Sequence, residues 1–91
     1  MHVIVRLGRR FADEAGFAER RLELPDGSTA ASLLKAMAKA APGLSAADAG
    51  TIDLAVANLS VNKQAVDPQH PEASRLKDGD EAYLYGVISG G

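Results

Sequence analysis

The chain has 91 residues and a mass of 9.5 kDa, which suits one small domain over residues 1–91 and excludes two packed domains. Hydrophobic residues make up 46% of the sequence and charged residues 24%, a composition typical of a folded globular protein. A domain of this size buries only roughly 60–65% of the surface that its unfolded chain exposes, so little interior is left for a substrate pocket. We therefore expect a protein that is not an enzyme.

The charges argue against a nucleic-acid-binding protein, because ten basic residues are balanced by twelve acidic ones to a net charge of −2. Half of the basic residues lie within the first 21 positions, and we interpret them as a solvated strand face: Arg6, Arg9, Arg10, Arg20 and Arg21. The absence of cysteine excludes disulfides, thiolate metal sites and thiol nucleophiles. No apolar stretch suits a signal peptide or a membrane span, and we expect a cytoplasmic protein.

The first half of the chain predicts two strands and a helix. Apolar residues alternate over residues 3–7, which predicts a half-buried strand. Turn residues at 13–16 and a second alternating segment at 17–24 predict that the two strands form a hairpin, which ends at residues 25–27. A helix then follows, capped by Ser28 or Thr29. Its apolar residues form one stripe, and Pro42-Gly43 ends it: Ala30, Leu33, Leu34, Met37 and Ala41.

The second half predicts three further strands. Residues 44–53 are small and polar, and we expect a short turn of helix or a mobile loop there. Residues 54–61 read as a buried strand, Asn62-Lys63 as a tight turn, and residues 65–66 as the start of a short returning strand.

An irregular crossing and a final strand complete the chain. Residues 67–74 contain two prolines, and the turn at 77–80 leads into a strand over 81–85. The order is thus strand, strand, helix, strand, short strand, strand. This order predicts an α+β fold, a β-grasp roll with a mixed sheet of four to five strands and one main helix packed on one face.

Most candidate sites have a structural interpretation. His2 and His70 are too few for a metal site, so we assign no metal ligands and no catalytic residues. Asp78-Gly79-Asp80 lacks the spacing of a calcium loop and is interpreted as a turn. Tyr83 and Tyr85 share one face of the final strand, where they either pack on the sheet or form an exposed aromatic pair for a partner.

The last two residues, Gly90-Gly91, are harder to explain structurally. Two glycines there would arise by chance in roughly 0.5% of chains, and they follow a strand rather than a linker. We expect residues 87–91 to form a flexible tail that enters a narrow site on another protein. Because glycine has no Cβ, an enzyme and a nucleotide can approach its carboxylate closely. In a chain without cysteine, carried sulfur would have to be a thiocarboxylate on Gly91.

The sequence Leu76-Lys77-Asp78-Gly79-Asp80-Glu81, followed by an apolar strand and Gly90-Gly91, resembles the MoaD/ThiS family of ubiquitin-like sulfur carriers. Further similar segments cover nearly the whole chain: Phe11-Ala12-Asp13-Glu14-Ala15-Gly16, Asp26-Gly27-Ser28-Thr29 before Leu33-Leu34, and Val61-Asn62. The joint occurrence of the acidic turn and the diglycine is the most specific part of the resemblance.

The resemblance implies that a MoeB-like or ThiF-like adenylyltransferase activates Gly91 with ATP. A sulfur donor such as a cysteine desulfurase or a rhodanese would then supply sulfur, and the chain itself would bind no cofactor. Gly91 would hold the adenylate and then the thiocarboxylate, and the tail would comprise Gly90, Ser89, Ile88 and Val87. Tyr85 matches the position where MoaD proteins present an aromatic residue to their partner, so the expected partner surface is Tyr83 and Tyr85.

The receiving pathway stays open. ThiS proteins are usually shorter, so the length favours the small subunit of molybdopterin synthase, whose tail would enter a MoaE-like large subunit. MoaD tails commonly carry a proline pair before the glycines, whereas this chain has Gly86-Val87-Ile88-Ser89. Sulfur carriage for thiamine, cysteine or transfer-RNA thiolation, conjugation of Gly91 to lysines of other proteins, and a passive interaction module are the alternatives.

Overall fold

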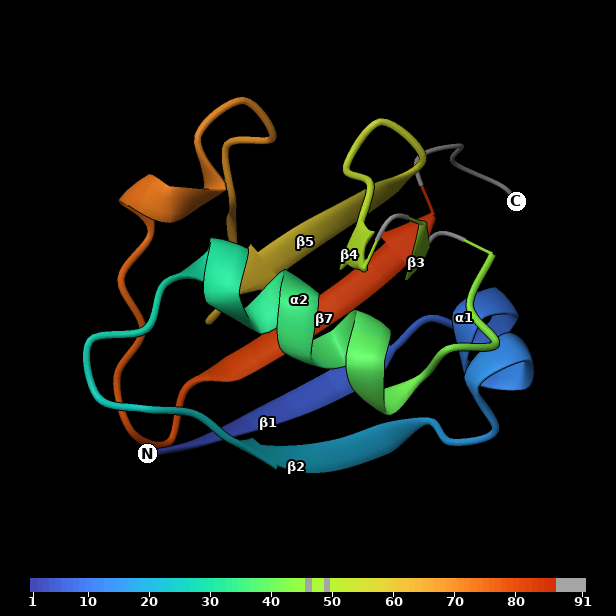
Figure 1. Cartoon of the computed structure of the whole chain (residues 1–91), viewed down its shortest axis with the longest axis horizontal. Coiled ribbons are helices and arrows are strands. Elements are labelled where there is room, and N and C mark those ends of the chain that lie inside the picture. The colour runs from blue at the N-terminus through green and yellow to red at the C-terminus, as the bar shows by residue number, and fades with distance from the viewer. Residues whose placement is uncertain (46, 49, 87–91) are drawn as a thin grey trace.

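The computed structural model describes residues 1–45, 47–48 and 50–86, and its centre is a mixed sheet crossed on one face by a helix (Figure 1). The strand order is β2-β1-β7-β5-β6; β1 and β7 run parallel, and the other neighbours are antiparallel. The helix, α2, covers Ala30–Ala40. The predicted β-grasp architecture with one main helix is therefore confirmed, with strands β1 His2–Leu7, β2 Glu19–Glu23, β5 Ala57–Val61, β6 Gln64–Ala65 and β7 Glu81–Gly86.

The core forms where the period-two strands meet the period-3.6 stripe of α2. Val3, Val5 and Leu7 of β1 are buried, as the alternation predicts, and so is Leu84 of β7. The predicted stripe of α2 faces them, and all its members are buried: Ala30, Leu33, Leu34, Met37 and Ala41. Because strand side chains alternate, the residues between these buried positions point away from α2.

The connection between the first two strands is a helix, so the prediction of a hairpin turn at 13–16 is wrong. Helix α1 covers Arg9–Ala15 and ends at Gly16, whose φ is 86° and whose amide donates to the Ala12 carbonyl at 2.9 Å. Only Phe11 of α1 is buried. A seven-residue helix with one buried side chain has no repeating apolar pattern that the sequence could reveal. The antiparallel pairing of β1 with β2 is nevertheless present.

The segment after α2 also differs from its prediction. In place of a turn of helix or a loop, β3 (Ala47–Asp48) and β4 (Thr51–Ile52) form a small antiparallel sheet. Ile52 is buried, and β4 contacts α2. The strand predicted to begin at Leu54 begins at Ala57, because Asp53 forms a turn in which its carboxylate accepts the Ala55 amide at 2.8 Å.

The close contact between α1 and the loop after α2 explains why residue 43 is a glycine. A Cβ on this residue would lie 2.7 Å from the carbonyl oxygen of Glu14, so only glycine fits. The φ of Gly43 is not positive, so the close approach to Glu14, and not a left-handed backbone, requires glycine at this position. The Glu14 carboxylate accepts the Ser45 amide at 2.8 Å, and hydrogen bonding from Ser45 lowers the pKa of Glu14 below its ordinary value of 4.5.

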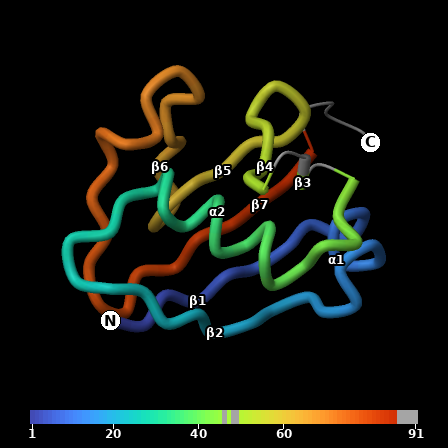
Figure 2. The backbone as a smooth tube through the Cα atoms, viewed as in Figure 1, coloured from blue at the N-terminus to red at the C-terminus, as the bar shows by residue number. Residues whose placement is uncertain are grey.

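After β6, the chain crosses to the end of the sheet that lies next to the N-terminus (Figure 2). Asn62 and Lys63 have positive φ values of 50° and 69°, as the predicted tight turn requires, and β6 returns one residue earlier than expected. The crossing contains one 3₁₀ turn, η1, over Pro71–Ala73. It brings the chain to the start of β7 beside β1, and β7 becomes the central strand.

Candidate functional site

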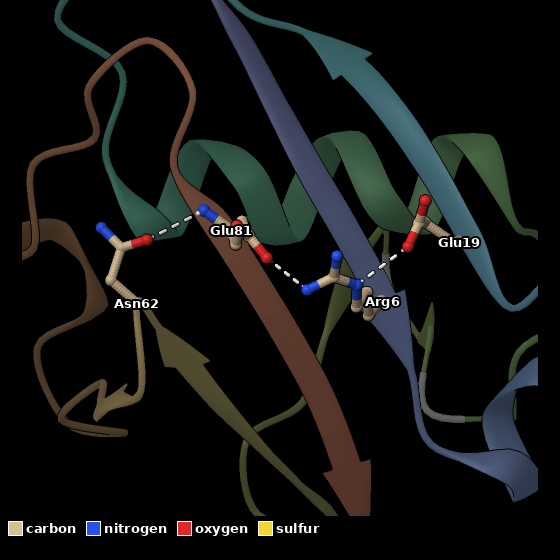
Figure 3. A network of polar contacts seen from close by, with 4 residues as sticks. All are labelled: Arg6, Glu19, Asn62 and Glu81. Carbon is tan, nitrogen blue, oxygen red and sulfur yellow. Dashed lines mark hydrogen bonds and ion pairs between the residues drawn. The ribbon is translucent and has the colours of Figure 1, made fainter.

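The sheet face that points away from α2 is the candidate site, and we call it the open face. It is formed by the side chains that alternate with the buried core residues: His2, Ile4, Arg6, Glu19, Arg21, Glu23, Asn58, Ser60, Glu81, Tyr83 and Tyr85. In Figure 3, α2 lies behind the sheet while Arg6, Glu19 and Glu81 lie in front of it.

Arg6 joins three adjacent strands on the open face. Its Nε donates to the Glu19 carboxylate on β2 at 2.8 Å, and its Nη1 donates to the Glu81 carboxylate on β7 (Figure 3). These hydrogen bonds, that to Glu19 first and that to Glu81 second, raise the pKa of Arg6 above its ordinary value. Because all three side chains are about half exposed, the network is a fixed surface pattern of charges rather than a large source of stability.

The two tyrosines of β7 form a stacked pair next to this network. The ring centroids of Tyr83 and Tyr85 are 5.1 Å apart at an interplanar angle of 20°. Leu84 between them is fully buried on the opposite face, whereas 44% of Tyr83 is exposed. The structure therefore places a stacked aromatic pair on the central strand, with Tyr83 exposed and Tyr85 half-buried.

The open face has a depression of about 510 Å³ that is lined by Arg6, Ser60, Asn62, Lys63, Glu81, Ala82 and Tyr83. None of these seven residues is a histidine or a cysteine, and the one carboxylate, that of Glu81, is paired with Arg6. This lining offers hydrogen-bond donors, charges and an aromatic ring for binding, but no arrangement of nucleophile and base.

The acidic turn before β7, Asp78-Gly79-Asp80, is stabilised by hydrogen bonds to its two carboxylates. The Asp80 carboxylate accepts the Lys77 amide at 2.8 Å and the side-chain amide of Asn62 at 3.0 Å. The Asp78 carboxylate accepts the His2 amide at 2.7 Å, and Gly79 has a φ of 86°. Because both carboxylates are used by amides of the chain, the structure supports the interpretation of this segment as a turn.

Asn62 was not identified as a site residue from the sequence, although its match to the family was noted. Its side-chain oxygen accepts the Glu81 backbone amide at 3.0 Å (Figure 3). Its backbone amide donates to the Glu81 carbonyl at 2.8 Å. Together with the Asp80 contact, these bonds clamp the β5–β6 turn to the start of β7. The sequence signals were that match and an asparagine at a turn position that needs positive φ.

The far end of β7 is also held. The side-chain amide of Asn58 donates to the Gly86 carbonyl at 3.2 Å, and the Gly8 amide donates to the Leu84 carbonyl at 2.7 Å. The chain thus leaves Gly86, five positions before Gly91, from an anchored central strand. The predicted reactive residue and tail lie outside the described residues: Gly91, Gly90, Ser89, Ile88 and Val87.

The histidines stay apart from the open-face network. The His2 amide contacts Asp78, and the His70 ring lies 3.3 Å from the Glu72 carboxylate. Within residues 1–45, 47–48 and 50–86, no three histidine, aspartate or glutamate side chains gather as a metal site would require. Among the helices that the structure describes, none has the length and apolar character needed to span a membrane.

Three of the solved structures that share this fold are archaeal proteins. A molybdopterin converting factor subunit 1, named as putative, from Pyrococcus furiosus is 26% identical, with a TM-score of 0.74 over 97% of this chain and 99% of that one. The small archaeal modifier protein 1 of Methanosarcina acetivorans is 25% identical, with a TM-score of 0.71 over 99% and 96%. SAMP1 from Haloferax volcanii is 24% identical and covers both chains completely, and its TM-score of 0.81 shows the shared fold. No protein of curated function matches the sequence significantly.

The family is established by a match over almost the whole chain. The model of the ThiS family matches residues 5–91, from the middle of β1 through the last glycine. The ubiquitin-like β-grasp fold of the solved relatives agrees with it. The chain therefore belongs to the ThiS family and has the role of a sulfur carrier or a ubiquitin-like modifier.

Proposed function

We propose that this protein is a sulfur carrier that acts through the carboxylate of Gly91. The observation that supports this most directly is that the family match includes Gly90 and Gly91. Since the sequence has no cysteine, the chain cannot carry sulfur as a persulfide. A carboxyl group on Gly91 is then the position at which sulfur is held as a thiocarboxylate.

The reaction needs activation because a carboxylate is a poor electrophile. An activating enzyme transfers AMP from ATP to the Gly91 carboxylate and releases pyrophosphate. Sulfide then displaces AMP and leaves a thiocarboxylate. A persulfide donor displaces AMP to form an acyl disulfide instead, and a second thiol then reduces this disulfide to release the thiocarboxylate. Glycine at both terminal positions removes the side chains that would otherwise obstruct the activating enzyme and its nucleotide. The ATP belongs to the activating enzyme, and the carrier supplies only the acyl group.

The open face is the surface we assign to the MoeB-like or ThiF-like adenylyltransferase. Tyr83 and Tyr85 present aromatic area there, and tyrosine is enriched in protein interfaces. Because both residues belong to β7, an enzyme that binds them also approaches the strand from which the tail departs. The cysteine desulfurase or rhodanese that supplies sulfur would act on the activated tail.

For the receiving pathway we propose molybdopterin synthesis, with a MoaE-like large subunit accepting the tail. The Pyrococcus furiosus relative, a putative molybdopterin converting factor subunit, supports this choice. Carriage of sulfur for thiamine, cysteine or transfer-RNA thiolation uses the same tail chemistry. A mixture of this carrier with a candidate large subunit and a pterin precursor decides between them, because only a true acceptor consumes the thiocarboxylate.

Intact-mass spectrometry tests the carrier chemistry. The chain is incubated with a ThiF-like enzyme, ATP and a sulfide source, and exchange of one oxygen for sulfur adds roughly 16 Da by acyl transfer at Gly91. A chain without Gly91 should gain nothing, and the surface variant Lys39→Gln should react as the wild type does. An unchanged wild-type mass, or an equal gain without Gly91, overturns the proposal.

A ubiquitin-like modifier is the second candidate, favoured by the similarity to the small archaeal modifier protein 1 of Methanosarcina acetivorans. In that role Gly91 forms an amide with a lysine of another protein, and AMP is the leaving group. The last lysine or arginine in the sequence is Lys77, so trypsin would leave residues 78–91 on each target lysine. Finding that remnant in cell lysate supports conjugation, and its absence beside a detectable thiocarboxylate excludes conjugation as the main role.

A further inference from the structure

Within the part of the chain that the structure describes, strand β2 is an edge of the main sheet and pairs with β1 alone (Figure 1). The opposite edge strand, β6, has only two residues. An edge strand exposes backbone amides and carbonyls that can pair with a strand of another molecule. At five residues, β2 is long enough for a short intermolecular ladder.

The register shows which backbone groups of β2 are free to pair. Two hydrogen bonds flank the β1–β2 pair: the Leu7 amide donates to the Ala18 carbonyl at 2.8 Å, and the Leu24 amide donates to the Met1 carbonyl at 2.9 Å. In this register, the backbone groups of the even-numbered residues of β2 hydrogen-bond with β1. Hydrogen-bonded positions alternate in an antiparallel pair, so the backbone groups of Glu19, Arg21 and Glu23 point outward. All three residues are exposed.

Charge selects one register for a symmetric pairing with a second copy. Centred on Arg21, the pairing would oppose Arg21 to itself and Glu19 to Glu23, which places like charges together. A pairing centred on Arg20 would place the two copies of Arg20 opposite each other. It would also require Glu19 to pair with Arg21 of the second copy, although the Glu19 carboxylate already binds Arg6. Centred on Leu22, it places Arg21 opposite Glu23 of the second copy, twice, with Leu22 facing Leu22. Opposite charges across a strand pair stabilise it, and like charges destabilise it.

We propose that two copies of this chain associate through antiparallel pairing of β2 about Leu22, so that their sheets join into one. The outward amides and carbonyls of Arg21 and Glu23 form the hydrogen bonds, and their side chains form two ion pairs. Tyr83 and Tyr85 lie on β7, on the far side of β1 from this edge, so the dimer leaves them accessible. Such a short strand pair buries little surface, and small interfaces are weak, so we expect association only at high protein concentration.

Sedimentation velocity tests the proposal over about 10 μM to 1 mM at low salt. The wild type should shift from monomer to dimer, and 0.5 M NaCl should weaken the shift because the ion pairs are exposed. Arg21→Glu or Glu23→Arg turns both cross-strand pairs into like-charge pairs and should raise the dissociation constant at least about tenfold. The double variant Arg21→Glu/Glu23→Arg restores opposite charges and should restore association.

The remote reversal Arg9→Glu on α1 is the matched control and should dimerise as the wild type does. Circular dichroism of each variant checks the fold. Hydrogen exchange gives an independent readout: the amides of Arg21 and Glu23 should become protected as concentration rises, whereas the Leu22 amide is protected throughout by β1. A wild type that stays monomeric at 1 mM overturns the proposal. So does a double variant that folds but fails to recover association.

Discussion

At the scale of single residues, several hydrogen bonds of Asn62 hold the start of β7. Asn62 bonds to Glu81 through its backbone and its side chain and also donates to Asp80, which is buried. Its neighbour Lys63 shares the positive φ but has an exposed side chain. These two adjacent residues therefore separate the effect of the backbone conformation from the effect of the side-chain hydrogen bonds.

Replacing Asn62 with glycine should destabilise the protein by about 1–3 kcal/mol, because Glu81 loses an acceptor and the buried Asp80 carboxylate loses a donor. The glycine keeps the positive φ without strain. Lys63→Gly makes the same kind of backbone change without removing such bonds, so its free energy of unfolding should stay within about 1 kcal/mol of the wild type. Urea denaturation measures both variants, and equal destabilisation would show that the Asn62 side chain has no special role.

At the scale of elements, helix α1, which the sequence did not predict, packs on the loop after α2. Helix α1 and the loop after α2 meet where Gly43 passes the Glu14 carbonyl and Ser45 binds the Glu14 carboxylate. Neither segment has a long periodic pattern, and each is held by contacts with residues distant in the sequence. Their packing depends on the absence of a single Cβ.

Gly43→Ala should destabilise the protein by about 1–3 kcal/mol, since the new Cβ would lie 2.7 Å from the Glu14 carbonyl oxygen, a backbone atom that can move only with α1. Gly86→Ala is the control: a Cβ there meets nothing within 4 Å, and the φ of Gly86 is not positive. Thermal unfolding followed by circular dichroism compares the two. If Gly43→Ala melts at the wild-type temperature, the close approach between these segments is not present in solution.

At the scale of the whole molecule, the sheet separates the packed face, which α2 covers, from the open face. The central position of β7 places Tyr83 and Tyr85 beside the Arg6 network, and the tail follows from the same strand. The proposed carrier role relies on this arrangement, because binding and presentation of the tail use one strand.

Tyr83→Ser should raise the KM of the activating enzyme for this chain roughly tenfold, since it removes an aromatic contact from the proposed interface. The kcat should change less, because the tail is intact. Val56→Ser is the matched control and should leave KM unchanged, because Val56 is 52% exposed but lies in the turn before β5, outside the open face. Initial rates of pyrophosphate release test both variants. Equal KM values for Tyr83→Ser and the wild type would remove Tyr83 from the interface.

The sequence by itself determined the elements whose pattern is local. Alternation over β1, the stripe of α2, the Asn62-Lys63 turn and the β-grasp class were predicted and are present, because each depends on side-chain periodicity or on backbone preference within a few residues. The acidic turn and the final glycines also indicated the family that the whole-chain match establishes. The role of Gly91 stays a prediction.

Only the tertiary structure decided what depends on distant residues. Helix α1 and strands β3 and β4 are short, and their stability comes from packing rather than from their own patterns. The parallel pairing of β1 with β7 brings Arg6 to Glu81, 75 residues apart. The antiparallel pairing of β5 with β7 brings Asn62 to Asp80. No local pattern encodes which strands become neighbours, because that choice minimises the free energy of the whole packed chain. The open face and the free edge of β2 both follow from that choice.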